Sequence, residues 1–397
     1  MKRMIAALLA LCMLLALFAC AKTNEPEPAA TPEAAAPTAA PKPEPTAEPE
    51  PEPTAEPKFE PEQEPEPEPA DVETFVFTDS VGREVELPVN IERVAISGPL
   101  AQIVVFALCP EKLVGIASKW DKTAEKYLAQ KYYDLPELGQ LYGGKGELNL
   151  ETLLASGAQV VIDVGEPKGS IKEDLDALTE QTGIPFVHIT MTTAAMGDAY
   201  RKLGELLHMP DEAEQLAVYC EGLYADMLAL SERVEKVDLL YITGEKGLNV
   251  IAQGSYHAEV IDLLSNNLAV VDSPSSKGTG NEVDMEQIMN WNPDVILFAP
   301  ASIYDTVGKD PMWSEITAIK TGNYYEVPFG PYNWMGFPPS VQRTLGMLWM
   351  AKLLYPDAVE YDLKTAVKEN YKLFYHCNLS DRDYELLIAN SIGVQAQ

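Results

Sequence analysis

The chain has 397 residues and a formal net charge of −32, with 61 acidic against 29 basic side chains. Residues 21–74 carry −12 and residues 1–20 carry +2, so −22 belongs to the rest of the chain. Because nucleic acids and anionic lipid surfaces attract basic patches, this balance argues against both as binding partners.

The N-terminus has the features of a secretory signal. A short basic head precedes the apolar run 4–18, which is shorter than the roughly 20 residues that a helix needs to cross about 30 Å of hydrocarbon. Leu17-Phe18-Ala19-Cys20 resembles a bacterial lipobox, in which the cysteine is acylated after cleavage. We therefore expect a lipoprotein signal peptide over 1–19 and a lipid anchor on Cys20, which tethers the protein to the outer face of the cell membrane. The alternative is an ordinary signal peptide that is cut elsewhere.

Residues 20–74 are dominated by Glu, Pro, Ala and Thr. Repeated proline blocks regular hydrogen bonding, and repeated glutamate repels itself, so this segment cannot bury enough apolar surface to fold. We expect a disordered, extended tether, which at about 3.1 Å per residue would reach roughly 165 Å when fully stretched.

From residue 75 the pattern becomes that of a folded α/β chain. Residues 73–79 and 83–88 alternate apolar and polar side chains around a Ser-Val-Gly turn, which predicts a β-hairpin. Continuous apolar strands that alternate with helices indicate a parallel sheet covered on both faces. We predict these strands at 93–97, 113–117, 159–163 and 184–189, and helices at 100–108 and from 150 to 155.

A single long helix is predicted after this first half. Residues 211–234 keep a helical period, and Pro210 with Asp211 forms a suitable start. A helix of this length spans about 36 Å, enough to run along two lobes. We therefore expect an N-terminal lobe over 75–209, an interlobe helix over 210–235 and a C-terminal lobe over 236–397.

The second half repeats a phrase of the first. Residues 149–162 and 284–296 each contain a glutamate that opens an amphipathic helix, then a break, then a buried strand. Duplicated lobes suggest a cleft between them. The remaining elements of this half are predicted as strands at 238–242 and 324–328 and helices at 260–264 and 340–354.

Several short motifs occur in a family-like order: Thr78–Arg83, Glu92–Val94, Asn149–Glu151, Met285–Ile296, Pro311–Trp313, and Trp334 with Pro338–Ser340. Over residues 75–357 the chain resembles the solute-binding proteins of ABC importers for iron–siderophores, haem and corrinoids. The resemblance implies an α/β fold of two lobes with mainly parallel sheets joined by one long interlobe helix, the class III periplasmic-binding-protein type. It further implies a monomer that binds a metal chelate and passes it to an ABC permease and its ATPase, with no catalysis and no cofactor of its own.

The same resemblance assigns a role to two glutamates. Glu151 and Glu286 stand where family members place one surface glutamate per lobe for docking on the permease. One exposed carboxylate on each lobe would steer that docking electrostatically. The alternative is that each only stabilises the positive end of its helix.

Ligand contacts are expected in loops that follow the strands of each lobe. Aromatic walls suit a large planar or greasy chelate, and the family places an aromatic residue at Trp334. For each candidate the alternative is core packing, and His257 is either a weak metal-ligand candidate or a hydrogen-bonded structural histidine. The candidates are Ser97, Gly98, Pro99, Trp120, Tyr142, Tyr256, His257, Tyr304, Tyr332 and Trp334.

The chain departs from the family pattern after Trp334. Members that bind anionic chelates often carry an arginine there, whereas Met-Gly-Phe follows here and the nearest arginine, Arg343, falls inside a predicted helix. This departure disfavours a strongly anionic siderophore and leaves corrinoid, haem, a neutral chelate or a smaller metal or oxyanion complex. Other cationic cleft candidates are Lys119, Lys145 and Lys168.

Other chemical signals are weak. The glycine-rich run 139–146 nearly matches a phosphate loop but lacks the final Ser or Thr and a preceding buried strand. Cys109, Cys220 and Cys377 are too widely spaced for a disulfide framework, and four histidines offer little to a metallohydrolase. An enzyme on a similar fold or a stalked adhesin remains the alternative of another class.

Overall fold

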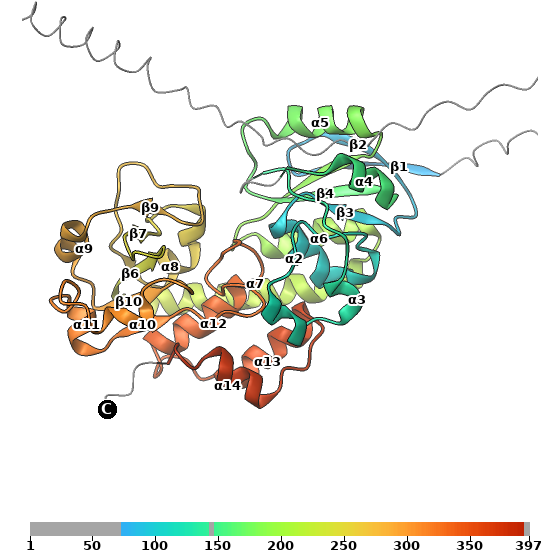
Figure 1. The fold of residues 1–397 in the computed structure, drawn as a ribbon. Coiled ribbons are helices and arrows are strands. Elements are labelled where there is room, and N and C mark those ends of the chain that lie inside the picture. The colour runs from blue at the N-terminus through green and yellow to red at the C-terminus, as the bar shows by residue number, and fades with distance from the viewer. Residues whose placement is uncertain (1–72, 143–146, 393–397) are drawn as a thin grey trace, which may run out of the picture. The chain divides into compact units, whose positions relative to one another are not determined.

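Figure 1 shows a computed structural model of the chain, which describes residues 73–142 and 147–392. The predicted signal peptide, the lipidation site Cys20, nearly all of the tether and the cleft candidate Lys145 lie outside these residues. No helix in the two described ranges is both long enough and apolar enough to cross a membrane.

The N-terminal lobe combines a hairpin with a parallel sheet. The hairpin strands are antiparallel, and Asp79 closes their turn by accepting from the backbone N–H groups of Val81 and Arg83. The parallel sheet has the order β3-β4-β5. The predicted strand at 113–117 forms only two isolated bridges. Leu113 pairs with Val94, and Ile116 pairs with Glu137. The strands are β1 (Thr74–Thr78), β2 (Glu84–Pro88), β3 (Val94–Ile96), β4 (Val160–Gly165) and β5 (Phe186–Thr190).

Helices cover both faces of the parallel sheet, as the continuous apolar strands predicted. Alternate strand residues such as Val161 and Phe186 pack with Leu175 in one core, whereas Ile162 and Val187 belong to the larger core on the other face. The helices of this lobe are α2 (Pro99–Leu108), α3 (Gln130–Tyr133), α4 (Leu150–Ser156), α5 (Ile171–Thr182) and α6 (Met196–Leu207), with 3₁₀ turns at Pro110–Lys112 and Lys122–Lys126.

The long helix α7 (Pro210–Arg233) connects the lobes. It contacts α6 and α2 on the N-terminal side, and α8 (Glu259–Leu264) and α12 (Arg343–Leu354) on the C-terminal side. Its 24 residues begin at Pro210, where a proline fits the first turn because that turn has no intrahelical partner for the missing N–H.

The C-terminal lobe contains a mixed sheet of order β11-β10-β6-β7-β9, with β8 paired to β6. The strands β11, β10, β6 and β8 are parallel, whereas β7 is antiparallel to both β6 and β9. Its strands are β6 (Asp238–Thr243), β7 (Asn249–Val250), β8 (Asn266–Asn267), β9 (Asn281–Glu282), β10 (Val295–Phe298) and β11 (Tyr324–Glu326). Its helices are the 3₁₀ turn Tyr256–Ala258, α8 (Glu259–Leu264), α9 (Met285–Trp291), α10 (Tyr304–Val307) and α11 (Thr317–Thr321).

Three further helices, α12 (Arg343–Leu354), α13 (Leu363–Phe374) and α14 (Asp381–Leu387), end the described chain. They do not belong to the C-terminal lobe alone. Helix α12 contacts α7 and α8, whereas α13 contacts α2 of the N-terminal lobe. The single predicted segment 236–397 therefore contains helices that tie the two lobes together.

The repeated phrase folds into the same unit twice. Asn149 caps α4 by accepting from Thr152 N, and Asp284 caps α9 by accepting from Gln287 N. Each helix ends on a left-handed residue, Gly157 and Asn292, and the buried strands β4 and β10 follow. This backbone conformation is open to glycine and tolerated by asparagine, which explains the break in each copy.

Candidate functional site

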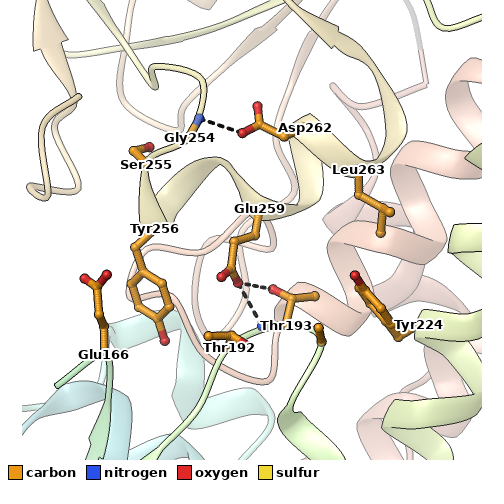
Figure 2. A pocket seen from close by; sticks show the side chains of 11 residues that line it. Glu166, Thr192, Thr193, Tyr224, Gly254, Ser255, Tyr256, Glu259, Asp262 and Leu263 are labelled. Carbon is orange, nitrogen blue, oxygen red and sulfur yellow. Dashed lines mark hydrogen bonds between the residues drawn. The ribbon is translucent and has the colours of Figure 1, made fainter. Parts of the chain in front are cut away.

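A pocket of about 430 Å³ lies where residues of both lobes and the interlobe helix meet. Figure 2 shows the lining, in which Glu166 follows β4, residues 192–194 follow β5, Tyr224 belongs to α7, and the remaining six residues belong to the segment 254–263 that includes α8. Its lining residues are Glu166, Thr192, Thr193, Ala194, Tyr224, Gly254, Ser255, Tyr256, Glu259, Asp262 and Leu263.

Three donors converge on one oxygen of Glu259. Its Oε2 accepts from Thr193 N at 2.8 Å, from Thr193 Oγ1 at 2.6 Å and from Arg343 Nη1 at 2.6 Å. We call these three donors the donor cluster. The donor cluster and its acceptor Glu259 join the segment after β5, the first residue of α8 and the first residue of α12. Their hydrogen bonds are therefore a direct contact between the lobes.

Arg343 is held rigidly within this cluster. Its side chain is 1% exposed, its Nη2 donates to Tyr256 O, and its guanidinium carbon lies 4.6 Å from the centre of the Tyr256 ring. Burial lowers the pKa of Arg343, and the neighbouring Tyr256 and Glu259 oppose that shift. A buried guanidinium needs an anionic partner, because an unpaired buried charge is strongly destabilising.

Further hydrogen bonds hold the lobes together on either side. Tyr256 Oη donates to Met191 O at 2.5 Å. Gln102 Nε2 of α2 donates to Tyr332 Oη at 3.1 Å, and Ser340 Oγ donates to Leu100 O at 3.3 Å. Specific polar pairs outside the donor cluster therefore also hold the two lobes together.

Of the predicted cleft residues, Tyr256 lines the pocket, and His257 is the next residue in the sequence but is not part of the lining. His257 is buried, its Nδ1 lies 3.0 Å from Gly336 O, and burial lowers its pKa, which favours the neutral imidazole. Within the two described ranges, no group of three or more His, Cys, Asp or Glu side chains could hold a metal ion. The hydrogen bond to Gly336 O fits the structural interpretation of His257, and the metal-ligand interpretation stays a prediction.

Ser97 faces a buried polar chain in the N-terminal sheet. It donates to Asp163, whose Oδ2 lies 2.7 Å from His188 Nδ1. Gly98 and Pro99 begin α2 beside it. Sequence reasoning missed Asp163 and His188, although a polar residue inside each otherwise apolar strand was a visible signal.

The expected aromatic wall is not assembled. Trp334 is 0% exposed and Trp120 is 3% exposed, and both belong to the large core. Because neither side chain reaches the pocket, we no longer assign these two residues as ligand contacts. Among the remaining aromatic candidates, Tyr332 packs against Trp120 with the rings tilted, Tyr304 packs on Phe298 and Tyr324, and the Tyr142 hydroxyl donates to Asp174 at 2.6 Å.

The charged candidates lie on the surface. Glu151 and Glu286 are exposed in the first turns of α4 and α9. Lys168 Nζ lies 3.8 Å from Glu166 Oε2, and Lys119 Nζ lies 3.5 Å from Glu137 Oε1. Both lysines are exposed.

Thr193, Glu259 and Arg343 were not predicted as site residues. They lie far apart in sequence, and no local spacing links them. Arg343 was noted only as a helical residue beyond the expected position, whereas the fold brings its guanidinium to the contact between the lobes.

Comparison with known proteins agrees with this fold. Residues 109–330, more than half of the chain, match the periplasmic binding protein family, so the chain belongs to that family. A solved ABC transporter solute binding protein from Sulfurospirillum deleyianum superposes with a TM-score of 0.72 at 26% identity, over 79% of this chain and 99% of that one. The predicted class III fold, two α/β lobes joined by one long helix, is thus confirmed.

Two curated relatives are informative. The molybdate-binding protein MolA of Haemophilus influenzae is 25% identical over 76% of this chain and 90% of its own length. The Fe(3+)-citrate-binding protein YfmC of Bacillus subtilis is 22% identical over 54% of this chain and 66% of its own length.

The thiols of the described residues provide a simple test of the packing. Cys109 and Cys220 are buried and free, and burial raises the pKa of Cys109 to about 12 and that of Cys220 further. Since the thiolate is the reactive form, we expect neither to react with a thiol reagent at pH 8 until the protein is unfolded. Rapid labelling of either cysteine in the native protein, located by peptide mass spectrometry, would contradict this packing.

Proposed function

We propose that this protein is the extracytoplasmic, lipid-anchored solute-binding component of an ABC importer. It captures a metal-containing solute between its lobes and delivers it unchanged to the permease and its ATPase. The family match is the observation that carries this proposal. The pocket that both lobes and α7 line gives the solute a place to bind.

The first candidate for the solute is a metal chelate of the iron–siderophore, haem or corrinoid class, as the family resemblance implies. The relative named for ferric citrate supports it. The second candidate is a small metal oxyanion. The relative named for molybdate spans most of this chain, and the buried Arg343 supplies a cation beside a pocket of modest volume.

Titration calorimetry with a panel of solutes tests the function. The panel contains sodium molybdate, sodium tungstate, ferric citrate, haem and cobalamin. We expect one of them to bind with 1:1 stoichiometry and a Kd at or below about 1 μM, equivalent to about −8 kcal/mol, and to be recovered chemically unchanged. Conversion of a bound solute would instead favour an enzyme on this fold, and selective capture of a macromolecule would favour an adhesin.

The permease contact is the second part of the proposal. Glu151 and Glu286 occupy matching positions in the two copies of the repeated unit, each in the first turn of a short capped helix. Both are exposed, so each carboxylate is available to a basic partner. We assign these two residues to docking on the permease.

A further inference from the structure

The donor cluster has the composition of an anion-binding site. A backbone N–H, a hydroxyl and a guanidinium N–H are directed at a single oxygen, Glu259 Oε2, at distances of 2.6–2.8 Å. Charge-assisted hydrogen bonds of this kind are the strong ones, and they recognise an anionic oxygen whatever molecule carries it. In this structure the anionic oxygen belongs to the protein itself.

The donors are fixed, whereas the acceptor has room to move. The Arg343 side chain is 1% exposed and is pinned by Tyr256 through its ring and its carbonyl oxygen. Thr193 is buried and presents a backbone donor. The Glu259 side chain is 26% exposed and lines the pocket, where Figure 2 shows its carboxylate bound to Thr193.

Arg343 also has unused donor capacity. Its Nε is buried and has no hydrogen-bond partner within the described residues. A Cβ at Gly336 would lie only 3.0 Å from this Nε, so glycine is the residue that fits where the backbone passes close to the guanidinium. An anion with several oxygens can use more of these donors than one carboxylate oxygen does.

From this geometry we propose that Glu259 is a built-in substitute for the solute. An anionic oxygen of the incoming solute, from a metal oxyanion or from a carboxylate of a metal chelate, displaces Glu259 from Thr193 and Arg343. This inference rests on the proposed solute-binding function and specifies its chemistry. It assigns to Arg343 the contact with an anionic solute, for which this chain has no arginine directly after Trp334.

Displacement has two consequences. The solute must compete with a carboxylate that is already in place, so the wild-type protein binds it more weakly than the donors alone would allow. Because Thr193 lies on the N-terminal lobe and Glu259 on the C-terminal lobe, the solute also replaces a contact between lobes. Binding of the solute is thereby coupled to the contact between the lobes, and this coupling requires no additional hinge.

The test compares Glu259→Gln with Glu173→Gln. Both variants remove one carboxylate, but Glu259 contacts Arg343 and Thr193, whereas Glu173 is an exposed acid on α5 that does not line the pocket. The probes are sodium molybdate and ferric citrate, measured by titration calorimetry in a buffer of low anion content. If Glu259 occupies the donors about nine-tenths of the time, its neutralisation raises the affinity for the matching probe about tenfold, whereas Glu173→Gln changes it by no more than about twofold through general charge.

Thermal unfolding supplies an independent readout. Glu259→Gln leaves Arg343 without an ion-pair partner among residues 73–142 and 147–392, so we expect a lower Tm without anion and a larger rise in Tm than the wild type shows when the matching probe is added. Arg343→Met should abolish binding of that probe. Since Arg343→Met removes a buried group and can impair folding, the two glutamine variants decide the question by themselves.

The outcomes separate this inference from the proposed function. Tighter binding of molybdate alone identifies an oxyanion solute, and tighter binding of ferric citrate alone identifies a chelate carboxylate; both support the inference. Equal gains in the two variants, or no gain in Glu259→Gln, overturn it. If that failure accompanies 1:1 binding of haem or cobalamin, the solute-binding function stands, and if no solute of the panel binds, the proposed function fails as well.

Discussion

Replacement of Trp334 by alanine is expected to destabilise the folded part by about 3–5 kcal/mol, the usual cost of removing a large buried aromatic side chain. Trp334 is 0% exposed within the large core, and its Nε1 donates to Gly330 O at 3.4 Å. The substitution would leave a cavity beneath α12, where Gly346 allows close approach to the Trp334 carbonyl. Urea unfolding followed by circular dichroism measures the change, with solute affinity measured in parallel below the transition.

Trp334→Phe is the matched control, because it keeps most of the apolar volume and loses only part of the stability. Both variants should bind the solute with nearly wild-type affinity once folded. If instead Trp334→Ala kept full stability and lost affinity, Trp334 would be a wall of the ligand site, as the family resemblance suggested, and its placement in the core would be wrong.

Reversal of both surface glutamates, Glu151→Lys with Glu286→Lys, is expected to abolish solute uptake while solute affinity stays unchanged. In the proposed docking, each substitution places a positive charge opposite a basic permease surface, and like charges in contact cost several kcal/mol, a loss of more than about a hundredfold in docking. The solute affinity is unaffected because both residues are exposed and neither lines the pocket. Transport in proteoliposomes that contain the permease and its ATPase, together with calorimetry, measures the two quantities.

Two controls distinguish docking from helix stabilisation. Glu173 is an exposed acid in the first turn of α5 and has no counterpart in the repeated unit, so Glu173→Lys should leave uptake intact. The helix-dipole contribution of each glutamate is at most about 1 kcal/mol, so unfolding of the double variant should change little. Normal uptake by the double-reversal variant would rule out these glutamates as docking residues.

The fold was largely predictable because it rests on local patterns. The apolar strands β4 and β10, the capped helices before them and the long α7 all have a clear period or a clear start and stop signal. The strand predicted at 113–117 was wrong in extent, since its pairing depends on partners that an apolar run cannot specify. Helices α12 and α13 were assigned to one lobe because sequence position does not reveal which lobe a terminal helix will contact.

The site was much less predictable. Its central contact joins Thr193, Glu259 and Arg343, three residues whose proximity exists only after both lobes and α12 have packed. The aromatic prediction erred for a related reason: Trp120 and Trp334 have the chemistry of a ligand wall, but apolar surface of that size is equally suited to a core. Only burial distinguishes the two roles.

Native mass spectrometry of the protein isolated from its own organism would show whether it carries a solute that it leaves unchanged. We expect one small solute per protein molecule, released intact on collisional activation and able to rebind to the emptied protein with unchanged mass. A protein that carries no small molecule and binds none of the panel, or one that returns a chemically altered product, would contradict the proposed function.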